Sequence, residues 1–236
     1  MNVEGAVAFV TGANRGLGEA FTRALLENGA AKVYGAARDP GTITVPGVVP
    51  VALDITSPEA IAAAAALAGD VTLLVNNAGI STGTGVLADD TMEGGRREFE
   101  TNVWGPLAVS RAFAPILEAN GGGAVVNVLS VLSWLAMPQT AMYSASKAAA
   151  WSLTNSLRVE LAPRGTLVVG VHVGFMDTDM AAGVDAPKVS PESVVQATIE
   201  ALSDGRPEVL ADDTSRFVKA QLSGDLENLY PSLVNT

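Results

Sequence analysis

The stretch Thr11-Gly12-Ala13-Asn14-Arg15-Gly16-Leu17-Gly18 separates a short apolar run at residues 6–10 from a helical pattern at 16–28. The apolar run shows no polar alternation, which is typical of a strand buried on both faces of a sheet. Glycines between a strand and a helix allow a tight turn and a close approach of the backbone to phosphate, and the helix N-terminus supplies N–H donors. The sequence therefore predicts a phosphate-binding turn, with an ordinary tight turn as the alternative; its candidate binding residues are Gly12, Asn14, Arg15, Gly16, Leu17 and Gly18.

The alternation of strand and helix continues along the chain. Further strands are predicted at residues 32–36, 48–53, 71–75, 124–129, 167–173 and 208–210, and helices from 57 onward and at 92–119, 141–161 and 191–202. Gly105-Pro106 is expected to bend the helix at 92–119, because proline has no N–H for a helical hydrogen bond. Such alternation favours a doubly wound, mostly parallel sheet with helices on both faces. We expect a single Rossmann-type α/β domain over residues 1–236, with about seven parallel strands.

Composition and charge exclude several classes of function. The 236 residues are 48% hydrophobic and 17% charged, which excludes an intrinsically disordered chain. The net charge of −11 repels phosphate backbones and anionic lipids, so neither nucleic acid nor a membrane is an expected partner. With no cysteine and one histidine, no metal site is expected, and His172 lies in an apolar run that favours a structural role. The N-terminus carries no targeting pattern, which favours a cytoplasmic protein.

The residues after the second and third predicted strands bear on the choice of nucleotide. Arg38 stands twenty positions after Gly18, where an acidic residue would bind a ribose 2′-hydroxyl, and a guanidinium there suits a 2′-phosphate instead. Arg15 adds a second cation, so NADP(H) is favoured over NAD, although Asp39 could bind a 2′-hydroxyl and both arginines could be solvated surface charges. Asp54 is a candidate adenine contact, with a turn-capping role as the alternative, and Ile55 is a further candidate cofactor-binding residue.

A tyrosine and a lysine at the start of the helix at 141–161 suggest proton-transfer chemistry. Tyr143 and Lys147 are four residues apart and share one helix face. A nearby ammonium is expected to lower the tyrosine pKa from about 10, so that Tyr143 can exchange a proton with a carbonyl oxygen. Ser130 ends the fifth strand, where ligands bind in such sheets, and can hold that oxygen; Ser133 is a rival.

These motifs carry a family resemblance. With Asn76-Asn77-Ala78-Gly79 after the fourth strand and Asn102 in a helix, their order and spacing resemble the short-chain dehydrogenase/reductase family, including carbonyl reductases and ketoacyl-carrier reductases. The resemblance implies carbonyl/alcohol redox chemistry with a nicotinamide cofactor, Lys147 on the nicotinamide ribose, and Asn102 holding a relay water. It also implies cofactor contacts from Asn77, Ala78, Gly79, Tyr143, Lys147, Met176 and Thr178. The chain departs from the family at Val173, where proline is usual, and at Leu129.

Two segments are expected to line the substrate pocket. Residues 131–139 carry no charge, and the small substrate-loop region at about 175–190 contains one cation, Lys188. Such a pocket favours a neutral, bulky ketone, aldehyde or secondary alcohol, with Trp134 as a pocket or core residue.

The resemblance implies a homodimer or homotetramer paired through the helices at 92–119 and 141–161, with Trp151 and Leu157 as candidate contacts. An NAD-dependent alcohol dehydrogenase and a non-catalytic NADP(H)-binding sensor are the alternatives.

Overall fold

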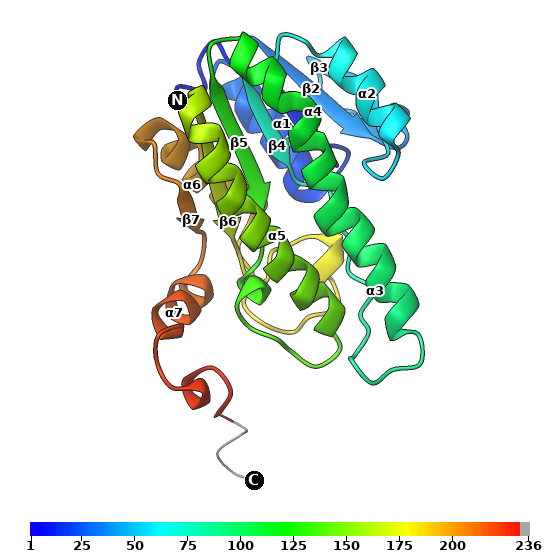
Figure 1. Cartoon of the computed structure of the whole chain (residues 1–236), viewed down its shortest axis with the longest axis vertical. Coiled ribbons are helices and arrows are strands. Elements are labelled where there is room, and N and C mark those ends of the chain that lie inside the picture. Colours follow the sequence, from blue (N-terminus) through cyan, green and yellow to red (C-terminus); the bar gives the residue numbers. More distant parts are fainter. Residues whose placement is uncertain (232–236) are drawn as a thin grey trace.

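A computed structural model describes residues 1–231 of the chain and contains one seven-stranded sheet (Figure 1). Its strands are β1 Val7–Thr11, β2 Lys32–Ala37, β3 Val48–Ala52, β4 Leu73–Asn76, β5 Gly123–Val128, β6 Thr166–His172 and β7 Glu208–Leu210. All neighbours pair in parallel, in the order β3-β2-β1-β4-β5-β6-β7. The strand order reverses beside β1, so the sheet is doubly wound. The predicted fold class is therefore confirmed.

Helices cover both faces of this sheet (Figure 1). They are α1 Gly16–Glu27, α2 Pro58–Leu67, α3 Thr91–Phe99, α4 Gly105–Ala119, α5 Ala141–Leu161, α6 Pro191–Asp204 and α7 Asp213–Gln221. One hydrophobic core joins the sheet to α1 and α6 through residues such as Phe21 and Leu202. The other joins it to α2, α4 and α5 through residues such as Ile61, Phe113 and Leu161. The sheet is thus shielded from water on both sides.

Strand β1 shows why its sequence is apolar without interruption. Ala8 and Val10 belong to the core beneath α1, whereas Phe9 points to the opposite core, where its ring centroid lies 4.7 Å from that of Phe113. Successive side chains of a strand point to opposite faces, so a strand covered on both sides needs apolar residues at every position. All parallel strands end at the same edge, and the turns after β1, β4, β5 and β6 therefore meet there.

The structure corrects the sequence prediction in three places. The helix predicted at 92–119 consists of α3, a π-helical segment at Glu100–Trp104, and α4, so the irregularity precedes Gly105-Pro106 rather than lying at that pair. Pro106 has no N–H to donate to the carbonyl of Asn102, four residues earlier, and this carbonyl therefore has no α-helical donor. The second correction is α7, which follows β7 and was not predicted; β4 also begins two residues later than expected.

No helix within residues 1–231 combines the length and the apolar character that crossing a membrane requires. Within the same range, no three His, Cys, Asp or Glu side chains gather closely enough to hold a metal ion.

Candidate active site

The turn between β1 and α1 is built from close backbone contacts. Gly12 and Gly16 adopt positive φ angles of 65° and 52°, a region that favours glycine. A Cβ on Gly18 would lie 2.0 Å from the carbonyl oxygen of Gly12, so no larger residue fits there without a backbone shift. Asn77, just after β4, donates from Nδ2 to the carbonyl oxygens of Thr11 and Gly12 at 2.9 and 3.1 Å. The glycine spacing is therefore a steric requirement of this turn.

The same turn fits an anionic group. Helix α1 begins at Gly16, and no side chain among the described residues caps its first turn. The N–H groups of a first helical turn have no partner inside the helix, and together with the helix dipole they attract phosphate. Arg15 is exposed beside them and forms an ion pair with Asp179, with Nη1 and Oδ2 3.4 Å apart. These features suit a dinucleotide pyrophosphate.

The region after β2 and β3 contains the candidate adenosine contacts. Arg38 is exposed directly after β2, and its positive charge contributes to a lowered pKa of Asp54, whose main cause is the hydrogen bonds from Thr56. Asp39 accepts a hydrogen bond from the Gly41 N–H at 2.9 Å, a local turn contact. Asp54 likewise accepts from the Thr56 N–H at 2.9 Å, the turn-capping geometry that we gave as its alternative role. Ile55 is buried and lies against Gly105.

The loop after β4 lies against the glycine-rich turn. The N–H groups of Asn77 and Ala78 donate to the Thr11 hydroxyl at 3.0 and 3.1 Å. A Cβ on Gly79 would lie 3.2 Å from Asn102 Oδ1 and 3.8 Å from Lys147 Nζ, so this glycine permits a close approach to two candidate site residues. The structure thus brings these motifs together. Thr11 was not singled out from the sequence, although it directly precedes the glycine turn.

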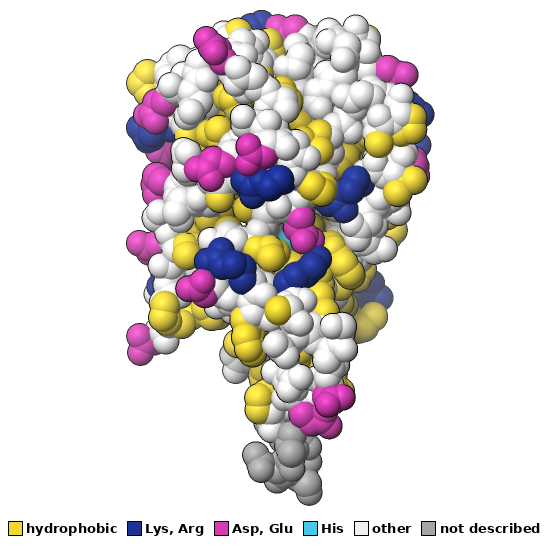
Figure 2. Space-filling view, turned by 90° about the vertical axis from the view of Figure 1, so that its left-hand side faces the viewer, with side chains coloured by type: hydrophobic (Ala, Val, Ile, Leu, Met, Phe, Trp, Pro, Cys, Tyr) yellow, Lys and Arg dark blue, Asp and Glu magenta, His cyan; other side chains and the backbone are white. Residues whose placement is uncertain are grey.

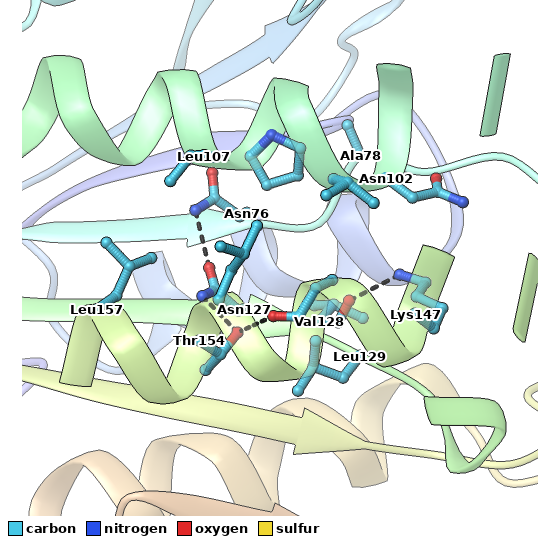
Figure 3. Close-up of a pocket in the computed structure, with 14 residues that line it drawn as sticks. Asn76, Ala78, Asn102, Leu107, Asn127, Val128, Leu129, Lys147, Thr154 and Leu157 are labelled. Carbon is cyan, nitrogen blue, oxygen red and sulfur yellow. Dashed lines mark hydrogen bonds between the residues drawn. The ribbon is translucent and has the colours of Figure 1, made fainter. Parts of the chain in front are cut away.

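Tyr143, Lys147 and Ser130 lie near one another at the carboxyl edge of the sheet. Ser130 lies beside Tyr143, and its side chain acts to lower the pKa of that phenol. The Nζ atom of Lys147 lies 5.7 Å from the centre of the Tyr143 ring and donates to the Val128 carbonyl at 2.8 Å (Figure 3). Ser133, the alternative candidate for holding the substrate oxygen, accepts from the Ser130 N–H at 3.4 Å and completes a capping box. The geometry therefore favours Ser130 over Ser133 as the partner of Tyr143.

Burial dominates the titration of the two candidate catalytic groups. Burial raises the pKa of Tyr143 to about 12; the Ser130 side chain opposes this shift and the Glu98 charge adds to it. Burial lowers the pKa of Lys147 to about 8. Our expectation that Lys147 lowers the pKa of Tyr143 is therefore wrong for the protein without a ligand. The reason is that desolvation disfavours both charged forms, and the ammonium is turned toward a carbonyl.

Asn102 is buried in the π-helical segment. Its side chain accepts from the Ile80 N–H at 2.9 Å and donates to the Ile80 carbonyl and the Ser146 hydroxyl at 2.9 and 3.0 Å. Both the oxygen and the nitrogen of this side chain are thus bonded to groups of the protein. Asn102, Pro106 and Lys147 nevertheless line a small cavity of about 20 Å³ between α4, α5 and the sheet (Figure 3). A cavity of that size can hold about one water where polar groups such as Asn102 and Lys147 line it.

The remaining predicted residues lie nearby but differ in their surroundings. Thr178 lies against Gly16, and Met176 forms an isolated β-bridge with Val189. Trp134 packs inward: its ring stacks on His172 with centroids 3.7 Å apart and meets the edge of Trp151 at 6.0 Å. These contacts favour a packing role for Trp134 over a place in the wall of an open pocket. Part of the Trp151 side chain is likewise in contact within the chain.

Sequence reasoning missed two neighbours of the site. Glu98 is 1% exposed and accepts from the Thr82 N–H and hydroxyl at 2.6 and 3.0 Å, which holds the loop after β4. The Tyr230 hydroxyl accepts from the Ala136 N–H at 2.9 Å, and Leu229 packs in one hydrophobic cluster with Trp134 and Tyr143. No sequence signal links residues so far apart along the chain.

Comparisons with known proteins identify the family of the chain. The short chain dehydrogenase family matches residues 6–188. A crystal structure of a short chain dehydrogenase from Burkholderia cenocepacia in complex with NADP is 44% identical, covers 99% of both chains and has a TM-score of 0.94. Carbonyl reductase [NADPH] 2 from Sus scrofa is 35% identical over 190 residues, 78% of this chain and 77% of that protein.

A longer relative also matches. The short chain dehydrogenase tazN from Aspergillus terreus is 32% identical over 224 residues, which are 83% of this chain, and the chain spans 49% of that protein. The family match covers most of the chain and includes the turn, the loop after β4 and the Tyr143–Lys147 pair. The chain therefore belongs to the short-chain dehydrogenase/reductase family.

Proposed function

We propose that this protein is an NADP(H)-dependent oxidoreductase that interconverts a neutral, bulky apolar ketone or aldehyde and the corresponding alcohol. The observation that carries this proposal is the cluster of Tyr143, Ser130 and Lys147 beside a turn suited to pyrophosphate. Tyr143 is the general acid and base, Ser130 holds the substrate oxygen, and Lys147 and Asn102 complete the catalytic set. Family membership and the fold support the reaction class.

Tyr143 performs the proton transfer in this proposal. The bound nicotinamide dinucleotide would supply or accept the hydride. The high pKa of Tyr143 keeps its hydroxyl protonated at neutral pH, ready to donate to a substrate oxygen during reduction. The Ser130 hydroxyl interacts with the Tyr143 side chain and orients the oxygen that receives the proton. Placing both donors in advance lowers the cost of charge developing on that oxygen.

Lys147 and Asn102 connect Tyr143 with water. Both residues line the cavity of about 20 Å³, and the Asn102 carbonyl has no α-helical donor because residue 106 is proline. We propose that one water donates a hydrogen bond to this main-chain carbonyl and accepts one from Lys147. A lysine with a pKa of about 8 exchanges a proton readily near neutral pH, so it can return to Tyr143 the proton given to the substrate.

The cofactor is proposed to be NADP(H). Arg38 and Arg15 are exposed cations at the edge where the ribose and phosphates would lie, and the relative from Burkholderia cenocepacia binds NADP. Asp39 is engaged in its own turn, which weakens the NAD alternative. The residues proposed to hold the dinucleotide are Gly12, Asn14, Arg15, Gly16, Leu17, Gly18, Arg38, Asp54, Ile55, Asn77, Ala78, Gly79, Tyr143, Lys147, Met176 and Thr178.

The substrate and the oligomer follow from the surfaces around the site. The uncharged segment 131–139 and the substrate-loop region at about 175–190 favour a neutral, bulky small-molecule substrate, and the similarity to a carbonyl reductase supports this.

We propose a homodimer or homotetramer formed through α4 and α5, since Trp104 before α4 is 50% exposed and Val159 on α5 is 76% exposed. Sedimentation velocity at micromolar concentration tests this, and a monomeric mass contradicts it.

The decisive experiment follows NADPH consumption over a panel of apolar ketones and aldehydes. We expect turnover with NADPH, weaker turnover with NADH, and none with Tyr143→Phe. A preference for NADH would favour the alternative of an NAD-dependent alcohol dehydrogenase, and a small charged keto acid as the best substrate would contradict the proposed pocket. No turnover, with NADPH still raising the melting temperature, would favour the sensor alternative.

A further inference from the structure

His172 is a buried titratable residue that the proposed reaction does not use. It is the last residue of β6, its exposed fraction is 0%, and its Nδ1 lies 3.1 Å from the carbonyl oxygen of Ser130. A carbonyl oxygen only accepts hydrogen bonds, so Nδ1 must carry the hydrogen. The indole of Trp134 stacks on the imidazole at 3.7 Å, with 18° between the planes. The ring is therefore held at one edge and on one face.

The opposite edge of the imidazole faces charged groups from three elements. Within residues 1–231, His172 Nε2 has no hydrogen-bond partner and lies 3.8 Å from Glu208 Oε1 on β7. Lys219 on α7 donates to the same carboxylate at 2.9 Å, and Arg158 on α5 donates to the Pro207 carbonyl at 2.9 Å. Figure 2 shows this face, where basic and acidic side chains surround the small visible area of the histidine.

These surroundings favour the neutral ring. Burial lowers the pKa of His172 to about 4, with smaller and opposing effects of Ser130, Glu208, Lys219 and Arg158. The nearby Glu208 carboxylate is already paired with Lys219, so it offers the histidine little compensation for a buried charge. A neutral ring that must donate through Nδ1 has a single tautomer available, with Nε2 unprotonated.

The bond from His172 fixes the residue that we assign to the substrate oxygen. The Ser130 carbonyl also accepts from the Ser133 N–H at 3.0 Å, and the Ser130 hydroxyl accepts from the Leu132 N–H at 3.1 Å. The Val131 N–H and the Ser130 hydroxyl donate to the Val173 carbonyl just after β6 at 2.9 and 3.5 Å. His172 is the side chain of β6 that contacts the Ser130 peptide itself. We propose that His172, neutral and protonated at Nδ1, is a positioning residue that holds the Ser130 peptide so that its hydroxyl faces Tyr143. This inference rests on the proposed function.

The first test reads the histidine directly and needs no substrate. His172 is the only histidine in the chain, so ¹⁵N-detected imidazole spectra of tag-free protein contain one residue. We expect the Nδ1–H tautomer and no titration between pH 8 and about 5. An Nε2–H tautomer, or a titration near the ordinary histidine pKa of about 6.5, would overturn the proposal.

The second test separates positioning from packing. In His172→Asn, the side-chain amide can occupy the place of Nδ1 and still donate, whereas His172→Leu fills similar volume without a donor. We expect kcat to fall roughly tenfold in the leucine variant, to recover to within about threefold in the asparagine variant, and KM for NADPH to stay unchanged in both. Equal losses in both variants, or no loss in either, would overturn the proposal.

The two tests keep this proposal distinct from the proposed function. If the wild-type protein turns over no carbonyl compound, the proposed reaction fails, while the tautomer still reports whether His172 holds Ser130. If the wild type is active and the leucine variant equals it, the positioning role fails and the reaction stands. Should the leucine variant not fold, the tautomer and the asparagine variant decide: an Nε2–H tautomer or a tenfold loss of kcat in His172→Asn overturns the proposal.

Discussion

The turn after β1 and the segment after β5 form two sides of the same site, but they are held in place differently. The glycine-rich turn at residues 12–18 is shaped mainly by its own backbone, as in the approach between Gly18 and the Gly12 carbonyl, and Asn77 adds one side-chain contact. The segment at residues 129–139 is fixed by side chains from distant parts of the chain, among them His172 and Tyr230. Local backbone geometry therefore shapes the phosphate side, and long-range packing shapes the substrate side.

Tyr143→Phe should produce the largest effect, and it should be confined to the substrate side. The change removes the proton that general acid catalysis needs, while the ring and its packing stay. We expect kcat to fall by roughly 10³-fold, within the range for such catalysts. NADPH affinity, measured by fluorescence titration, should change less than about threefold, because the variant removes one hydroxyl among the proposed dinucleotide contacts and leaves the glycine-rich turn untouched. A loss of NADPH affinity equal to the loss of kcat would contradict the separation of the two sides.

Gly18→Ala should have its main effect on the phosphate side of the site. The added Cβ would lie 2.0 Å from the Gly12 carbonyl oxygen and 2.5 Å from Asn77 Nδ2, so the backbone of the turn must move. We expect about 2–3 kcal/mol of lost stability and at least a tenfold weaker affinity for NADPH, from urea unfolding and fluorescence titration. Gly69→Ala is the matched control, since an added Cβ there meets nothing within 4 Å. Unchanged NADPH affinity in Gly18→Ala would show that the tight turn is not the phosphate site.

This difference explains what could be predicted from the sequence. The positive φ angles of Gly12 and Gly16 and the approach of Gly18 to the Gly12 carbonyl arise within the turn. The glycine spacing between a strand and a helix was therefore sufficient to predict it. The strands were found within about two residues, because a sheet covered on both faces demands uninterrupted apolar runs. The stack of Trp134 on His172 and the bond from Ala136 to Tyr230 join residues 38 and 94 positions apart in the chain. No local pattern signals such contacts.

The π-helical segment illustrates the same limit at shorter range. Pro106 signalled an irregularity, and proline chemistry explains why the Asn102 carbonyl lacks its α-helical donor. The sequence did not reveal that the chain widens before the proline instead of bending at it. That choice depends on the fit of Asn102 between Ile80 and Ser146, which are 22 and 44 residues away. Tertiary contacts therefore decided the local helix type.

The acid stability of the substrate side should depend on His172. Its folded pKa of about 4 lies below the ordinary value of 6.5, so the unfolded chain binds more protons between these two pH values. The stabilising contribution of the neutral His172 side chain is fully present above pH 6.5 and decreases as the pH drops toward 4. Below pH 4 this group lowers the stability no further. We expect the stability advantage of wild type over His172→Asn to shrink by about 2 kcal/mol between pH 6.5 and 5, measured by urea unfolding. A constant difference across that range would contradict a buried neutral histidine.

Tyr230→Phe should give the smallest effect and tests whether residues near the end of the described chain shape the substrate side. The variant removes the hydroxyl that accepts from the Ala136 N–H and leaves the ring in place. We expect about 1 kcal/mol of lost stability and a rise of about two- to threefold in KM for the carbonyl substrate, because segment 129–139 loosens. kcat and KM for NADPH should stay unchanged, since the Tyr143 cluster and the glycine-rich turn are held independently.

Tyr34→Phe provides the control for that experiment. Tyr34 lies on β2, and its hydroxyl donates at 3.0 Å to Asp70, which precedes β4 and therefore lies at the opposite edge of the sheet from the site. Its loss should lower stability by a similar amount without raising KM for the carbonyl substrate. If both tyrosine variants raise this KM equally, the effect reflects general loosening of the fold. If only Tyr230→Phe does, substrate binding depends on a contact that joins the segment after β5 to residue 230, and the two sides of the site can then be altered separately.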